Sequence, residues 1–160
     1  MLIGVISDTH DRLPLIDSAL GLFAAREVEA VIHAGDLIAP FAAKRLRIAP
    51  APVSVVYGNN DGERDGLKSV LPQIQDGPLF VVLDGRQVLV HHFIDWCKPA
   101  DLAQAEVVIT GHTHEVVNER RGKKLFLNPG ECCGWVTGRC TVAILDLDRL
   151  SAEICELPVS

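Results

Sequence analysis

Side chains that can bind a metal ion recur in this sequence directly after apolar, strand-like runs. A carboxylate, an amide or an imidazole follows each of five such runs. The residues are Asp8 and His10 in "SDTH", Asp36 in "AGDL", Asn59 in "GNND", His91 in "LVHH", and His112 and His114 in "GHTH". Ligands of open α/β sheets bind outside the carboxyl ends of the strands. If these strand ends share one edge, the side chains converge and form a polar site.

Each motif also has an ordinary structural explanation. Asp8 and His10 alone fit a turn with a helix N-cap, a lone His91 is more often a hydrogen-bonded core histidine, and "GNND" is a good turn sequence. The "GHTH" motif is harder to explain in this way, because two histidines at alternate positions after a strand are unusual. All five ordinary explanations together require five coincidences, so we favour one common site.

The types of side chain indicate which ions the site binds. Imidazole suits zinc, manganese, iron and nickel, whereas carboxylate and amide oxygens favour harder ions. The set contains no cysteine, which argues against a structural zinc site. Three oxygen-donating groups and four imidazoles are too many for one ion. Two ions that share one carboxylate would use all of them.

The order of the predicted elements indicates an α/β fold. Apolar strands are expected at 2–7, 30–36 and 52–61, with helices near 13–23 and 41–47 between them. The second half is richer in strands, and these are expected at 79–92 with a turn at Asp84-Gly85, and at 105–115, 125–131, 141–147 and 152–157. The predicted architecture is two sheets packed face to face with helices outside, in one domain over residues 1–160.

Composition restricts the class of protein and its location. The net charge is −6, and the basic cluster "ERRGKK" at 119–124 fits a hairpin turn, so a nucleic-acid polymer is disfavoured as partner. Five cysteines without a C-x-x-C motif suggest reduced thiols. No leader is evident, and no apolar run approaches the roughly 20 residues of a membrane helix. We therefore expect a cytoplasmic protein with no membrane partner.

The ordered motifs resemble those of the calcineurin-like metallophosphoesterases, in particular their small bacterial and archaeal phosphodiesterases. They are D-x-H at 8–10, G-D at 35–36, G-N-x-D at 58–61, a histidine after a strand at 91, and G-H-x-H at 111–114, followed by "NPGE" at 128–131. The resemblance implies an αββα sandwich of two mixed sheets. It also implies a binuclear centre that hydrolyses phosphodiesters by a metal-activated hydroxide.

The same resemblance assigns the ligands. Asp8, His10 and His114 would hold one ion, Asn59, His91 and His112 the other, and Asp36 would bridge them. Manganese is the expected metal, with nickel, iron and zinc as alternatives. The expected substrate is a small phosphodiester, and a homo-oligomer is left open.

Two positions depart from the family pattern. Asn60 stands where many relatives have a histidine that is the usual candidate proton donor, and His92 replaces a glycine of a His-Gly-His motif. Asn60 and His92 are therefore the candidate catalytic residues, Asn60 as a hydrogen-bond donor to phosphate and His92 as a general acid. His33 is expected to support a ligand or to pack beside the site.

Two other functions compete with hydrolysis. A retromer subunit resembles this family but acts as a scaffold, so a non-catalytic metal-binding scaffold is the main alternative. Its centre is impaired, however, whereas here no ligand is missing. A thiol enzyme that uses Cys132 and Cys133 is disfavoured, because no basic partner surrounds them in the sequence.

Overall fold

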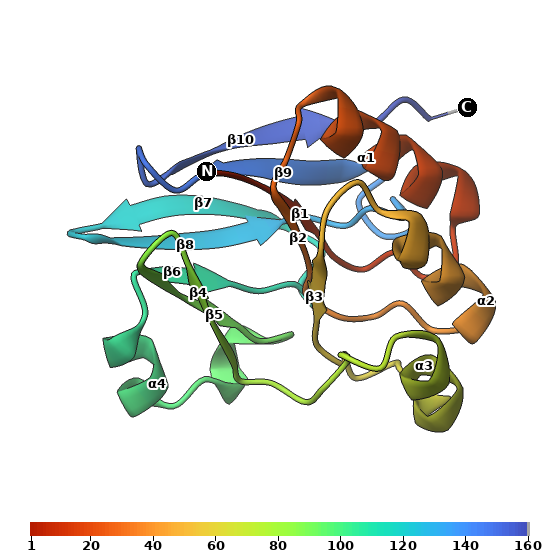
Figure 1. The fold of residues 1–160 in the computed structure, drawn as a ribbon, viewed down its shortest axis with the longest axis horizontal. Helices are drawn as coiled ribbons and strands as arrows, with labels where there is room; N and C mark the ends of the chain where they lie inside the picture. Colours follow the sequence, from red (N-terminus) through yellow and green to blue (C-terminus); the bar gives the residue numbers. More distant parts are fainter. Residues whose placement is uncertain (160) are drawn as a thin grey trace.

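Two mixed β-sheets pack face to face and carry helices on their outer faces (Figure 1). The computed structural model describes residues 1–159. The predicted αββα sandwich is confirmed. Alternation of apolar strands with helical segments produces this arrangement, because each sheet buries one face against the other sheet and needs cover on its second face.

The first sheet has the strand order β10-β9-β1-β2-β3. Strands β1 (Leu2–Ile6), β2 (Ala30–His33) and β3 (Val53–Val55) are parallel, as expected for strands joined through helices. Strands β9 (Thr141–Asp146) and β10 (Ser151–Glu156) extend it in antiparallel fashion. Because β1 and β2 lie next to each other, the residues after their carboxyl ends are neighbours.

The second sheet has the order β4-β5-β6-β8-β7. Its central strands β5 (Arg86–Val90), β6 (Val107–Ile109) and β8 (Lys124–Pro129) are parallel. The edge strands β4 (Leu79–Leu83) and β7 (Val116–Arg121) are antiparallel to their neighbours. The hairpin turns expected near Asp84-Gly85 and within 119–124 are confirmed.

Helices cover the outer face of each sheet. The first sheet carries α1 (Leu13–Ala25), α2 (Pro40–Ala43) with a following 3₁₀ helix (Lys44–Ile48), and α3 (Arg64–Val70). The second sheet carries only α4 (Pro99–Gln104) among the described residues, preceded by a 3₁₀ helix (Ile94–Trp96). None of these helices has the length and apolar character that a membrane span requires.

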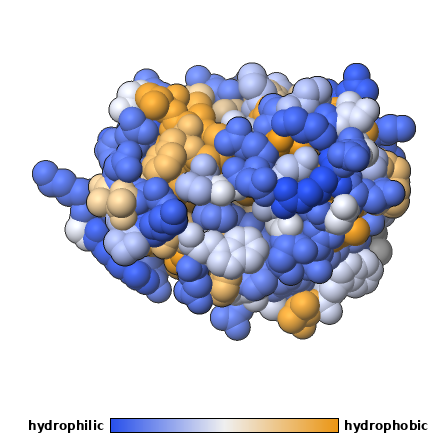
Figure 2. Space-filling model, turned by 90° about the horizontal axis from the view of Figure 1, so that it is seen from below, coloured by the Kyte–Doolittle hydropathy of each residue, from blue (hydrophilic) through white to orange (hydrophobic). Residues whose placement is uncertain are grey.

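Apolar residues fill the space between the sheets and the space under the helices. Ile3, Val5, Val90 and Ile109 belong to the layer between the sheets and are fully buried. Phe23 anchors α1 against the first sheet. The face of the molecule seen from below is mostly hydrophilic, and its most extended apolar area lies at the upper left in Figure 2.

The structure differs from the sequence expectation mainly at strand ends. The strands expected at 52–61 and 105–115 end at Val55 and Ile109, and the polar tips that follow are loops. Helices α3 and α4 and strand β7 were not predicted, because their short and mostly exposed segments lack a clear apolar period.

Candidate metal centre

The predicted polar side chains lie at the carboxyl ends of strands from both sheets. Asp8 and His10 follow β1, Asp36 follows β2 and Asn59 follows β3. From the second sheet, His91 and His92 follow β5, and His112 and His114 follow β6. The centre therefore lies where the carboxyl edges of the two sheets meet, and each sheet supplies part of it.

One half of the centre contains Asp8, His10, Asp36 and His114. The Nε2 atom of His10 lies 3.4 Å from Asp36 Oδ2 and 3.9 Å from Asp8 Oδ1, and His114 Nε2 lies 3.4 Å from the same Asp8 oxygen. Asp8 and Asp36 are 0% and 1% exposed. Donor atoms of Asp8, His10 and Asp36 all lie within 4.8 Å of one another, as close as ligands of a single ion must be.

Two buried atoms in this half have no hydrogen-bond partner within the described chain. They are Asp8 Oδ1 and His10 Nε2, which face each other across the cluster. A buried polar atom without a partner costs about 1–3 kcal/mol, and more when it is charged. The other oxygen of Asp8 is satisfied, because it accepts hydrogen bonds from Ser7 Oγ and the His112 amide. A cation between the two unpaired atoms removes this cost, so the residues fit a metal ion.

The other half contains Asn59, His92 and His112. Asn59 Oδ1 lies 2.9 Å from His92 Nε2 and 2.8 Å from His112 Nδ1. His92 Nδ1 lies 2.7 Å from the carbonyl oxygen of Ala34. A carbonyl can only accept, so a neutral His92 donates from Nδ1 and directs the lone pair of Nε2 toward Asn59 Oδ1. Two acceptors then face each other, which again fits a cation between them.

Asp36 stands between the two halves. Its Oδ2 atom is 3.4 Å from His10 Nε2 and 3.5 Å from His92 Nε2. Burial opposes the negative charge of Asp36, but the adjacent imidazoles of His10 and His92 outweigh it and hold the pKa of this carboxyl well below its usual range. The neighbouring carboxylates of Asp36 and Asp8 raise the pKa of His10 to about 9.

The two histidines after β5 lie in different directions relative to the centre. His92, and not His91, reaches Asp36 and Asn59. The Nδ1 atom of His91 accepts a hydrogen bond from the His92 amide, and its ring packs against Gly77 and Trp96. Neighbouring side chains on an extended segment point in opposite directions, so only one of the two can face the centre. His92 directs Nδ1 to the Ala34 carbonyl and Nε2 to Asn59 and Asp36, and its expected role as general acid stays a prediction.

Asn60 also acts differently from the expectation. Its backbone amide donates to Asp36 Oδ1, and its Nδ2 donates to Asp36 Oδ2 at 2.8 Å. The side chain of Asn60 is therefore bound to the central carboxylate and is not free to point into the space above the site. His33 is buried and is hydrogen-bonded to the hydroxyl of Thr9, the residue between Asp8 and His10 in the chain. Burial lowers the pKa of His33 to about 3.

The sequence reasoning missed the role of Glu131, the last residue of "NPGE". It is fully buried and accepts hydrogen bonds from His114 Nδ1 at 2.6 Å, from the Val136 amide and from the Thr137 hydroxyl. Burial alone raises the pKa of a carboxyl, but the Thr137 and His114 donors lower that of Glu131 to about 2. Because Glu131 binds the Nδ1 atom of His114, the Nε2 atom of the same ring faces Asp8. The signal for it in the sequence was the family-like "NPGE" motif at 128–131.

The two adjacent cysteines do not form a reactive pair. Cys132 and Cys133 are both buried, and burial raises the pKa of both thiols, that of Cys133 to about 12. They are therefore protonated at neutral pH and poor nucleophiles. Cys133 Sγ lies within 4.8 Å of ring nitrogens of His10 and His114, so this thiol borders the first half of the centre.

The backbone at the centre is strained. Asp8, His10, Asp36, His112 and His114 all have positive φ, between 39° and 69°. Such conformations cost of order 1–3 kcal/mol each for residues other than glycine, and they cluster at functional sites. They let the chain turn sharply after β1, β2 and β6, which aims each side chain back over the sheet edge.

Residues 1–150 match the model of the "Calcineurin-like phosphoesterase superfamily domain". This chain belongs to that superfamily. It is 41% identical to the phosphodiesterase MJ0936 of Methanocaldococcus jannaschii over 93% of this chain and 95% of that protein. It is 30% identical to the phosphodiesterase YfcE of Escherichia coli over 78% of this chain and 75% of that protein. The predicted family is confirmed, and the chain is an enzyme of this class.

Solved structures agree with this family. The structure of a novel archaeal phosphodiesterase matches with a TM-score of 0.85 and 38% identity, over 98% of this chain and all of that one. YfcE from Escherichia coli matches with a TM-score of 0.75 and 25% identity, over 99% and 100%. Vps29 from Entamoeba histolytica, at 21% identity and a TM-score of 0.71 over 98% of both chains, shares the fold alone.

Proposed function

We propose that this protein is a phosphodiesterase with a binuclear metal centre. Asp8, His10 and His114 hold one ion, Asn59, His92 and His112 hold the other, and Asp36 bridges them. The position of Asp36 Oδ2, 3.4 Å from His10 and 3.5 Å from His92, carries the proposal. When bound, two divalent ions activate water and neutralise charge on the phosphoryl group.

The residues of the chain organise this chemistry. Asn60 fixes the bridging carboxylate through two hydrogen bonds. Glu131 and the Ala34 carbonyl orient His114 and His92 so that each directs Nε2 inward. Four imidazoles favour manganese over magnesium, with nickel, iron and zinc as alternatives. The five unpaired cysteines support a cytoplasmic location.

The two adjacent histidines offer a matched test. We expect chelation to abolish hydrolysis of bis(4-nitrophenyl) phosphate and manganese to restore it. The His92→Ala variant should bind one ion fewer and lose most of its activity, whereas His91→Ala should keep both ions. Metal stoichiometry by mass spectrometry and initial rates are the measurements. If metal-free protein is fully active, or if His91→Ala is the variant that loses an ion, the proposal is wrong.

A non-catalytic scaffold on the same fold predicts a different result in that assay. A scaffold of this kind would bind two ions but would not hydrolyse any diester. The relatives that are named phosphodiesterases, at 41% and 30% identity, favour the enzyme.

A further inference from the structure

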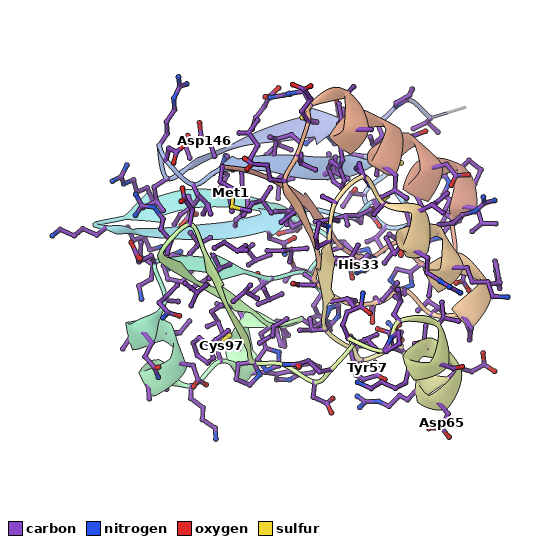
Figure 3. All side chains as sticks on the ribbon, in the orientation of Figure 1. Met1, His33, Tyr57, Asp65, Cys97 and Asp146 are labelled. Carbon is purple, nitrogen blue, oxygen red and sulfur yellow. The ribbon has the colours of Figure 1, made fainter. Side chains whose placement is uncertain are left out.

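Two aromatic side chains adjoin the Asn59, His92 and His112 half of the centre. The Phe93 ring centroid lies 4.2 Å from that of His112, and the Trp96 centroid lies 6.1 Å from those of both His92 and His112. The Phe93 and Trp96 rings meet edge to face at 5.8 Å. Both belong to the segment between β5 and α4, where Figure 3 labels the next residue, Cys97.

Trp96 stays 46% exposed although it touches buried histidines. A single exposed aromatic side chain is common on protein surfaces and needs no explanation by itself. Here the position matters, because one side of the indole packs on residues of the centre while the rest faces solvent. Trp96 and Phe93 therefore border the half of the centre beside which the ester substituent of a bound phosphoryl group would lie.

We propose that Trp96, together with Phe93, is a stacking surface for a flat aromatic ester group of the substrate. Such a group is an aryl ring or a nucleobase attached to the phosphoryl group that the centre holds. Aromatic rings favour offset or edge-to-face contact with one another, and stacking tolerates any ring with a π face. The inference rests on the proposed function, because the centre must hold the phosphoryl group.

A purely structural role makes a different prediction. If Trp96 only packs His92 and His112 in place, its removal weakens every ligand of the centre to the same extent. If Trp96 stacks on the substrate, its removal weakens only ligands that carry an aromatic group. Two phosphonates that differ in this group alone therefore separate the two roles.

The test is calorimetric titration of the manganese-loaded protein with phenylphosphonate and with methylphosphonate. We expect wild type to bind phenylphosphonate roughly tenfold more tightly. The Trp96→Ala variant should lose this preference and keep its affinity for methylphosphonate, and Trp96→Phe should keep part of the preference. The Phe41→Ala variant, which removes an aromatic residue that is 54% exposed on α2, is the matched control and should behave as wild type.

Two results would overturn the stacking surface: equal affinities in wild type, or equal weakening of both phosphonates in Trp96→Ala. If Trp96→Ala does not fold, as judged by circular dichroism, Trp96→Leu takes its place with the same expectation.

Adenosine 5′-phosphate and ribose 5-phosphate, compared in the same way, distinguish a nucleotide from a small aryl ester. Hydrolysis of bis(4-nitrophenyl) phosphate by the same samples tests the proposed function separately, since binding preference and turnover can fail independently.

Discussion

The structural role of Glu131 becomes clear only from the residues that contact it in the fold. Its carboxylate is fully buried, yet hydrogen bonds from His114, Val136 and Thr137 keep it charged. The acceptor on Nδ1 fixes the ring of His114 in the orientation that presents Nε2 to the centre. Glu131 therefore positions a proposed metal ligand and anchors the loop before β9 at the same time.

We expect Glu131→Gln to weaken manganese binding by about 10–100-fold, because second-sphere partners of metal-binding histidines contribute on this scale. The NH₂ group of the new glutamine would also face backbone N–H donors that now bond to the carboxylate, such as that of Val136. The free energy of unfolding should therefore fall as well. Calorimetric titration with manganese measures the affinity, and Glu115→Gln, an exposed acid nearby, is the control. Unchanged affinity in Glu131→Gln would refute the positioning role.

Asn60 and His92 leave the reaction without an evident proton donor among the residues assigned to the centre. Asn60 is hydrogen-bonded to Asp36, and His92 directs Nδ1 to the Ala34 carbonyl and Nε2 to Asn59. A general acid typically contributes about 10²–10⁴-fold by protonating the leaving group. We therefore expect the rate to depend steeply on leaving-group pKa across a graded series of aryl diesters. A flat dependence in wild type would show that an acid is present, and a flatter slope in Asn60→His would show that this position can supply one.

At the scale of the elements, the loops after the strands decide the geometry of the centre. The motif glycines permit close approach there, because a Cβ at Gly58 would overlap Asp36 and one at Gly111 would overlap Ser7 and Asp8. The strands themselves need only be apolar, whereas each loop must turn sharply within one or two residues.

The Gly58→Ala variant should therefore lose metal binding and about 1–3 kcal/mol of stability, since the added methyl displaces the bridging carboxylate. Gly21→Ala is the control, because Gly21 lies in α1 with open space around it. That variant should be more stable by about 0.5–1 kcal/mol. Urea unfolding and metal stoichiometry are the measurements, and equal stability of the two variants would contradict the overlap.

At the scale of the whole molecule, the centre joins the two sheets. Asp8, Asp36 and Asn59 come from the first sheet, and His92, His112 and His114 come from the second. Ions held between them, as proposed, would link the two sheets at the edge of the core. Because such a site exists only in the folded state, metal binding would stabilise the fold.

We expect manganese at 100 times its dissociation constant to add about 2.7 kcal/mol per site to the free energy of unfolding. For a chain of this size the melting temperature should rise by about 5–10 °C per site. Thermal unfolding with chelator and with manganese measures the shift, and Asp36→Asn should reduce it. A melting temperature that does not respond to manganese in wild type would rule out ions between the sheets.

The sequence alone determined the sandwich and the residue types of the centre. Apolar runs of strand length, the Asp84-Gly85 turn and polar residues after each strand are local signals, and they depend on few other residues. Only the tertiary structure showed that His92 rather than His91 reaches Asp36 and Asn59, and it revealed the contacts of Glu131. The Ala34 carbonyl that orients His92 and the His114 ring that meets Glu131 are far away in the chain. The direction of a side chain beyond a strand end depends on such contacts, which no local pattern encodes.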